Sequence, residues 1–191
     1  MSRLPPLTDA GWPPAIADMR AGFAGALNVY RVMAHHPALL RAWTDLRAHV
    51  VQGSSLNPQQ SEVVILRTGV RRQSHYEWVH HVVRGFDCDL SLARIAALRG
   101  PPDGMEPTDR VLASAVDALI NENALPRIVQ DALIGAVGVQ GLLDVIATVG
   151  FYTTLSYLLK SFETPVDVRV AERFAAIADS GHYGDLDRAD P

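Results

Sequence analysis

The sequence predicts an all-α fold, and two observations carry this prediction. Apolar residues recur at spacings of three and four along nearly the whole chain, which is the period of an amphipathic helix. No alternating run of apolar and polar residues is bounded by hairpin turns. The chain has 191 residues, and 48% of them are hydrophobic, which is ample for one core. We therefore expect one domain over residues 1–178 and a flexible tail over residues 179–191.

Prolines separate the first two predicted helices. Pro13 and Pro14 can open a helix that continues to about His36, because Pro37 disfavours a helical conformation in the residue before it. A second helix is expected over residues 37–52, where the glycine that follows ends it.

Two closely spaced helices follow. Asn57 and the proline after it are an N-cap and a first-turn proline, and they predict a helix over residues 58–72. Ser74 with Glu77 three residues later matches a capping box, so the next helix is expected over residues 74–86. Because almost no linker joins these two helices, they should form a tight corner.

The C-terminal half contains five further predicted helices. Asp89 or Ser91 caps a short helix that ends at Gly100, and a loop over 101–107 precedes an amphipathic helix over 108–121.

A long apolar stretch then begins at Pro126, and the glycines from 135 to 141 are expected to interrupt it. Residues 142–159 are apolar on nearly every side, as expected of a helix buried in a core or between subunits, and a last helix is predicted over 166–177.

Composition and charge argue against several classes of partner. The net charge is −4 and lysine is almost absent, so the chain offers no basic surface and we expect no nucleic-acid partner. No apolar stretch is expected to reach the roughly 18 residues that span a bilayer, and the N-terminus does not have the pattern of a signal peptide. We expect no membrane partner and a cytoplasmic location. The single cysteine, Cys88, cannot form an internal disulfide.

The densest acid and base chemistry lies between Ser74 and His81. In a helix, Glu77 and His81 are four residues apart, and Ser74 lies on the same face. Glu62 precedes four apolar residues in the helix before, and a carboxylate near a core must be paired or protonated. The tight corner could bring Glu62 over the Glu77 and His81 face. We therefore predict His81, Glu77 and Glu62 as the catalytic residues.

An alternative interpretation places this face in water, where a Glu77–His81 contact contributes only a few tenths of a kcal/mol. Trp78 and Gly85 argue against it, because a large aromatic beside a residue without a side chain suggests that something packs there. Solvent access distinguishes the two: a closed pocket favours catalysis.

We expect neither a metal nor another cofactor. Glu77 and His80 have the Glu-x-x-His spacing of di-iron bundles, but the chain has no second copy of that motif. The histidines at 75, 80 and 81 lie on different faces of a helix, which does not suit a zinc site.

These motifs resemble the carboxymuconolactone decarboxylase and alkyl hydroperoxidase D superfamily, in its branch with a Tyr-Glu-Trp-x-x-His signature. The resemblance covers most of the chain, and it is carried by Asn28-x-x-Arg31-x-Met33-x-His35-x-Pro37, by the segments 61–67 and 76–81, and by Gly150-Phe151-Tyr152. It implies an all-α, alkyl hydroperoxidase D-like bundle built around a helical hairpin. It also implies a homo-oligomer (dimer, trimer or hexamer) with a pocket near the subunit contacts.

The sequence departs from this family at two points. Hydroperoxidase members place Cys-x-x-Cys-x-x-x-His after a glutamate, whereas in this register the chain has Ser74, Glu77 and His81 after Glu62. Without those cysteines no sulfenic acid can form, so we expect no peroxidase activity of the peroxiredoxin type. Decarboxylase members keep Glu77 and His81 but have an arginine near Ser74, which argues against decarboxylation of a carboxylated lactone.

The leading hypothesis is a cofactor-free acid/base enzyme, of the decarboxylase-like lyase, isomerase or lactone-opening kind, that acts on a small oxygenated organic acid or lactone. His81 is the proton shuttle, Glu77 its orienting partner or second acid, and Glu62 the supporting carboxylate. The expected substrate contacts are Ser74, Tyr76, Trp78 and Arg67 or Arg71.

One alternative is a non-catalytic member that binds a metabolite or has a structural role. A weaker one is redox activity through Cys88 between subunits.

Overall fold

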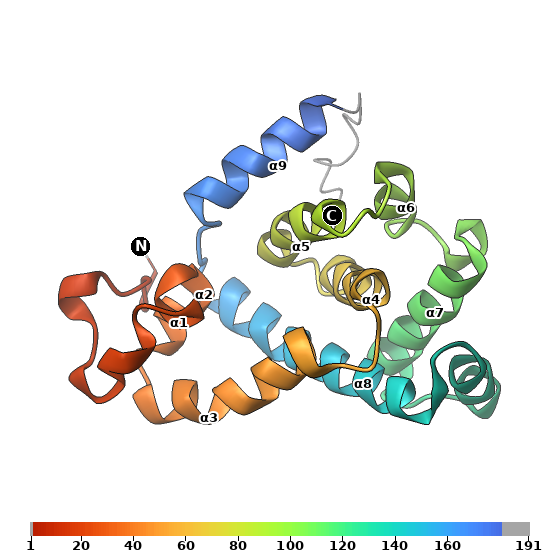
Figure 1. Cartoon of the computed structure of the whole chain (residues 1–191), viewed down its shortest axis with the longest axis horizontal. Helices are drawn as coiled ribbons and strands as arrows, with labels where there is room; N and C mark the ends of the chain where they lie inside the picture. The colour runs from red at the N-terminus through yellow and green to blue at the C-terminus, as the bar shows by residue number, and fades with distance from the viewer. Residues whose placement is uncertain (1, 181–191) are drawn as a thin grey trace.

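The computed structural model describes residues 2–180, and it contains helices and no strand in that range (Figure 1). The predicted fold class is therefore confirmed. The helices are α1 (Phe23–Ala26), α2 (Asn28–Met33), α3 (Pro37–Ala48), α4 (Pro58–Arg71), α5 (His75–Asp87), α6 (Leu92–Ala97), α7 (Pro107–Glu122), α8 (Arg127–Ser161) and α9 (Val168–Ser180). The predicted tail begins inside α9, and its part after 180 lies outside the described residues.

The α4/α5 hairpin lies at the centre of the molecule, with α6, α7, α8 and α9 around it (Figure 1). Asn57 caps α4 as predicted: its side chain accepts from the Gln60 backbone N–H at 2.9 Å, and the Gln60 side chain accepts from the Asn57 N–H at 3.0 Å. The chain turns between the two helices at Gln73, whose φ of 51° is left-handed. The tight corner is thus formed.

The capping box predicted at the start of α5 is wrong. Ser74 occupies the N-cap position, but its side chain makes no capping hydrogen bond, and its hydroxyl is buried without a partner among residues 2–180. Glu77 does not fold back on the helix end because its carboxylate lies beside His81 instead. An ionic contact one turn along the same helix has replaced the cap.

The single first helix predicted from Pro13 to His36 is also wrong. Two 3-10 turns, at Asp9–Gly11 and Pro14–Met19, precede the short helices α1 and α2. Leu27 is extended (φ −122°, ψ 133°), and the next N–H, that of Asn28, donates to the Asp167 carboxylate at 3.0 Å rather than to a helix carbonyl. A contact with a distant segment therefore breaks the helix that local periodicity favoured.

Helix α8 is interrupted where glycines predicted a break. Gly138 has φ 74° and ψ 176°, a conformation essentially restricted to glycine. By length and composition α8 is apolar enough to cross a membrane, so the expectation that no stretch reaches that limit is wrong. Only a few charges fall in this helix, and one of them, Asp144, is bonded to His49 and Ser55. Helix α8 also packs against α4 and α7, as a core helix does.

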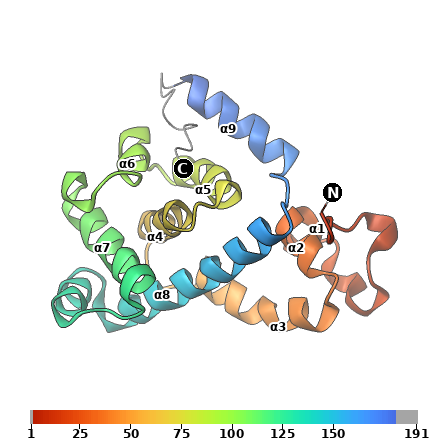
Figure 2. The ribbon, with the colours of Figure 1, turned by 180° about the vertical axis from the view of Figure 1, so that it is seen from behind.

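Two hydrophobic cores lie on either side of the α4/α5 hairpin. The first joins the hairpin to α6, α7 and α8 and includes Val63, Leu66 and Trp78. The second joins Ile65 and Tyr76 to the N-terminal segments and to the C-terminal half of α8. Figure 2 shows these N-terminal helices gathered at the end of α8 away from α7. They cover the hairpin face that carries the acid and base residues.

Candidate active site

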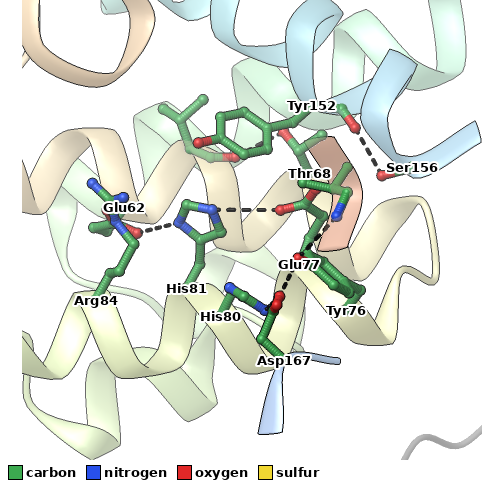
Figure 3. Close-up of polar contacts among 12 residues, drawn as sticks. Glu62, Thr68, Tyr76, Glu77, His80, His81, Arg84, Tyr152, Ser156 and Asp167 are labelled. Atoms are coloured by element: carbon green, nitrogen blue, oxygen red, sulfur yellow. Dashed lines mark hydrogen bonds and ion pairs between the residues drawn. The ribbon is translucent and has the colours of Figure 1, made fainter. Parts of the chain in front are cut away.

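His81 lies between two carboxylates in the interior (Figure 3). Its Nδ1 is 2.6 Å from Glu62 Oε2, and its Nε2 is 3.4 Å from Glu77 Oε2. The other oxygen of Glu62 accepts from Arg84 Nε at 3.1 Å. Glu62, Glu77 and His81 are 5%, 3% and 4% exposed, respectively. The three predicted catalytic side chains are thus brought together away from bulk water, and the alternative of a solvated helix face does not hold.

The hairpin positions these groups through simple helix geometry. Glu77, His81 and Arg84 occur at positions i, i+4 and i+7 of α5, so they share one face. Glu62 comes from the second turn of α4, which packs closely against α5. Four apolar residues follow Glu62 in α4, and the helix carries this carboxylate into the interior as they pack.

Burial and pairing oppose each other at this pair. Burial on its own raises the pKa of Glu62, but the charges and hydrogen bonds of His81 and Arg84 outweigh it and lower the pKa. Burial disfavours the His81 imidazolium, but Glu62 and then Glu77 outweigh it and raise the pKa. Both shifts favour an imidazolium beside a carboxylate, a state in which Nε2–H of His81 faces Glu77.

Glu62, His81 and Glu77 together form what we call the Glu62–His81–Glu77 relay. A cavity of about 40 Å³ opens beside it, between α5, α2, α3 and α8. Glu77 lines it, and Glu77 Oε1 is buried without a hydrogen-bond partner among residues 2–180. Tyr152 also lines it, with its ring edge-on to the His81 ring at 4.9 Å. Burial raises the pKa of Tyr30 to about 12 and raises that of Tyr152 well above its ordinary value, so both phenols are neutral donors.

Tyr76 and His80 form a second polar cluster with Asp167 at the edge of the cavity (Figure 3). The Tyr76 hydroxyl donates to Asp167 Oδ2 at 2.5 Å, and its ring stacks on that of His80 at 4.1 Å. His80 Nε2 lies 3.2 Å from the same oxygen but is not aligned for a hydrogen bond. Tyr76 thus contributes its ring to the cavity, while its hydroxyl holds the segment before α9.

The predicted substrate arginines lie elsewhere, which corrects the sequence interpretation. Arg67 forms a fork with the Asp117 carboxylate at 2.8 and 2.6 Å, and its third nitrogen donates to the carbonyls of Leu98 and Gly100. Arg71 bonds Asn121 at 2.7 Å and lies 3.4 Å from Asp117. Neither lines the cavity, because α4 directs both side chains towards α7.

Ser74 and Trp78 are also outside the cavity. Trp78 belongs to the first core, and the Arg99 guanidinium lies 4.7 Å from its ring. Ser74 lines a separate pocket between the start of α5 and the end of α8.

Sequence reasoning missed Arg84, Arg47 and the two tyrosines at 30 and 152, which all line the cavity. Arg84 had a detectable signal, because it continues the spacing of Glu77 and His81. Tyr152 lies in the segment that carried the family resemblance. Arg47 had no such signal, because it lies in a different helix, α3, which precedes the α4/α5 hairpin.

Redox chemistry through Cys88 receives no support from its surroundings. Its thiol donates to the Gly85 carbonyl at 3.3 Å, and burial followed by the Glu62 charge raises its pKa. A raised pKa disfavours the reactive thiolate. Within residues 2–180, no three His, Cys, Asp or Glu side chains are grouped to hold a metal ion.

The overall fold is shared with solved structures of another protein. The apo debrominase Bmp8 matches with a TM-score of 0.74 at 12% sequence identity, covering 93% of this chain and 98% of Bmp8. A cysteine-to-alanine variant of Bmp8 in complex with 2,3,4-tribromopyrrole matches with a TM-score of 0.73 at 13% identity, with the same coverage. The match shows the alkyl hydroperoxidase D-like fold that the resemblance implied. No protein-family model matches the sequence, and no curated protein is significantly similar to it.

Proposed function

We propose that this protein is a cofactor-free acid/base enzyme that acts on a small oxygenated organic acid or lactone, by isomerisation, elimination or ring opening. One observation carries the proposal: the buried Glu62–His81–Glu77 relay ends at Glu77, which lines a cavity and whose Oε1 has no hydrogen-bond partner among the described residues. Perturbed, coupled groups in a concave site are typical of catalytic centres.

The geometry refines the roles expected for the three residues. Glu62 fixes the His81 ring through Nδ1, so Glu62 is the orienting group. Glu77 is the base: its free oxygen accepts a proton from a substrate C–H or O–H. His81 is the acid: it donates Nε2–H to a different substrate atom or to a departing oxygen. The proton then returns from Glu77 to His81 across their 3.4 Å contact, which should shorten when substrate binds.

The structural neighbour gives this proposal modest support. Bmp8 is described as a debrominase, so the same fold holds an enzyme. Because one fold hosts many unrelated reactions, the argument for chemistry depends on the site and not on this likeness.

Hydrogen–deuterium exchange tests the proposal without knowledge of the full reaction. A panel of short hydroxy acids, oxo acids and lactones would be incubated with the protein in D₂O, and substrate C–H signals followed by NMR. We expect His81→Gln to lower the exchange or turnover rate by about 10² to 10⁴, the usual contribution of positioned proton transfer. Glutamine is chosen because alanine would leave the buried Glu62 carboxylate facing an empty space.

The matched control is His75→Gln, which changes an exposed histidine on the same helix. With His75→Gln, substrate hydrogens should exchange at the wild-type rate. Thermal melts should show that both variants are folded. Equal rates for wild type and a folded His81→Gln variant would overturn the proposal and favour the alternative of a metabolite-binding protein.

A further inference from the structure

Arg47 presents an unused hydrogen-bond donor to the cavity. It lies in the last turn of α3, lines the cavity, and its Nε is buried without a hydrogen-bond partner within residues 2–180. Its guanidinium carbon lies 4.0 Å from the centre of the Phe23 ring and 5.5 Å from that of Tyr30. Stacking of this kind holds the flat group in place and leaves Nε available to a ligand.

The charge of Arg47 is also unused. Arg84, the other arginine of the cavity, is paired with Glu62, which also pairs with His81. Arg47 forms no ion pair with a carboxylate in the part of the chain that the structure describes. A guanidinium in this position favours an anionic ligand, and its planar edge suits a carboxylate.

The cavity therefore offers two complementary unused groups. Arg47 provides a positive donor, and Glu77 Oε1 provides a buried acceptor. A ligand that satisfies both has a carboxylate and, close to it, a hydroxyl or an acidic C–H. The volume is about 40 Å³, whereas one water needs roughly 10–15 Å³, so only a few heavy atoms can enter.

We propose that Arg47 binds the substrate carboxylate and makes the site selective for short hydroxycarboxylates over neutral analogues. This inference rests on the proposed function and specifies its substrate class. It transfers to Arg47 the role that sequence reasoning gave to Arg67 or Arg71, whose donors are directed to Asp117 and Asn121.

Binding of lactate and of its neutral counterpart lactamide, followed by protein NMR titration, tests this assignment independently of turnover. Wild type should bind lactate about tenfold or more tightly than lactamide, since a charge-assisted bond is lost with the amide. In Arg47→Gln, lactate affinity should fall to that of lactamide, and lactamide affinity should stay unchanged. The control is Arg41→Gln on the same helix, whose side chain pairs with Asp18 at the surface; it should bind as wild type.

Three outcomes would overturn the inference: no lactate binding by wild type, no preference for lactate over lactamide, or wild-type preference in a folded Arg47→Gln variant. Should Arg47→Gln fail to fold, Arg47→Met keeps an unbranched stem against Phe23 and is judged by the same criterion. His81→Gln separates this test from that of the proposed function. If His81→Gln exchanges substrate hydrogens as wild type does while Arg47→Gln loses the preference, the acid/base proposal fails and the carboxylate site stands.

Discussion

Glu62 and His81 depend on each other, because neither can keep its charge in the interior alone. Burial opposes both charges, and the 2.6 Å contact between them reverses the effect of burial on each pKa. Arg84 adds a second positive charge to the same carboxylate. At the residue scale, the charges of the site are therefore stabilised by one another. Their contribution to the free energy of unfolding must depend on pH.

The pH range of this contribution follows from the two shifts. The raised pKa of His81 contributes stability below its ordinary value of 6.5, and this is lost as the pH rises through the folded-state pKa. The lowered pKa of Glu62 contributes above its ordinary value of 4.5, and this is lost as the pH falls through the folded-state pKa. The pair is most stabilising between these two values.

Glu62→Gln tests this range. We expect it to lower the free energy of unfolding by about 3 kcal/mol near pH 5.5, as when one partner of a buried ion pair is removed. The difference from wild type should shrink as the pH rises through the folded-state pKa of His81, because the charge that Glu62 pairs with is then lost. Urea denaturation at several pH values measures it. Glu172→Gln changes an exposed carboxylate on α9 and should give a small difference that does not vary with pH; a similarly flat difference for Glu62→Gln would contradict the pairing argument.

At the element scale, α8 is two helical segments joined by one residue that needs glycine. No atom lies within 4 Å of a Cβ added at Gly138, so space does not exclude a side chain there. The φ of 74° at Gly138 disfavours a side chain, because L-residues are strained in that conformation. The break lets the segment before 138 turn away from the long apolar segment that packs on α4.

Gly138→Ala and Gly135→Ala are a matched pair for this argument. Gly138→Ala should lower the free energy of unfolding by about 1–3 kcal/mol through backbone strain. Gly135 is helical and also has open space around it, so Gly135→Ala should raise the free energy by about 0.5–1 kcal/mol. Thermal or urea denaturation of both variants measures the difference, and equal effects would show that the backbone at 138 is not constrained.

At the scale of the whole molecule, the active-site residues lie where two cores meet. The α4/α5 hairpin provides Glu62, Glu77 and His81, while α2, α3 and α8 close the cavity over them. The cavity is closed only when the N-terminal segments pack against the α4/α5 hairpin. Closure of the candidate site and packing of the second core are therefore linked.

The outer face of α8 bears on the sequence expectation of a homo-oligomer. Val139, Leu143, Ile146 and Tyr157 recur on one face of the helix and are 61%, 59%, 40% and 59% exposed. An apolar stripe of this kind is typical of a protein contact surface. We expect a second copy of the chain to cover it.

Leu143→Glu tests this expectation at an exposed position. The wild type should have an oligomeric mass in size-exclusion chromatography with light scattering, and Leu143→Glu should shift it towards the monomer while the melting temperature of the fold changes little. Leu39→Glu, at an exposed leucine on α3, should keep the wild-type mass. A monomeric wild type, or equal masses for all three proteins, would remove α8 as an interface.

Much of the fold was predictable because its signals are local. Helical periodicity identified the fold class, Asn57 with the following proline marked the start of α4, and glycines marked the break in α8. The two failures have different causes. At Leu27 the cause is a distant contact, because the N–H of the next residue donates to Asp167. At Ser74 the cause lies within α5, because the Glu77 carboxylate contacts His81 one turn along the same helix.

The sequence by itself determined which titratable groups come together, since Glu77 and His81 are one helical turn apart and a short corner joins them to Glu62. Only the tertiary structure decided that these groups are hidden from water, that Glu62 rather than Glu77 orients His81, and that Arg47 replaces Arg67 at the cavity. The physical reason is that spacing along one helix is set by local geometry. Burial and pairing between helices depend on packing that brings residues far apart in the chain together.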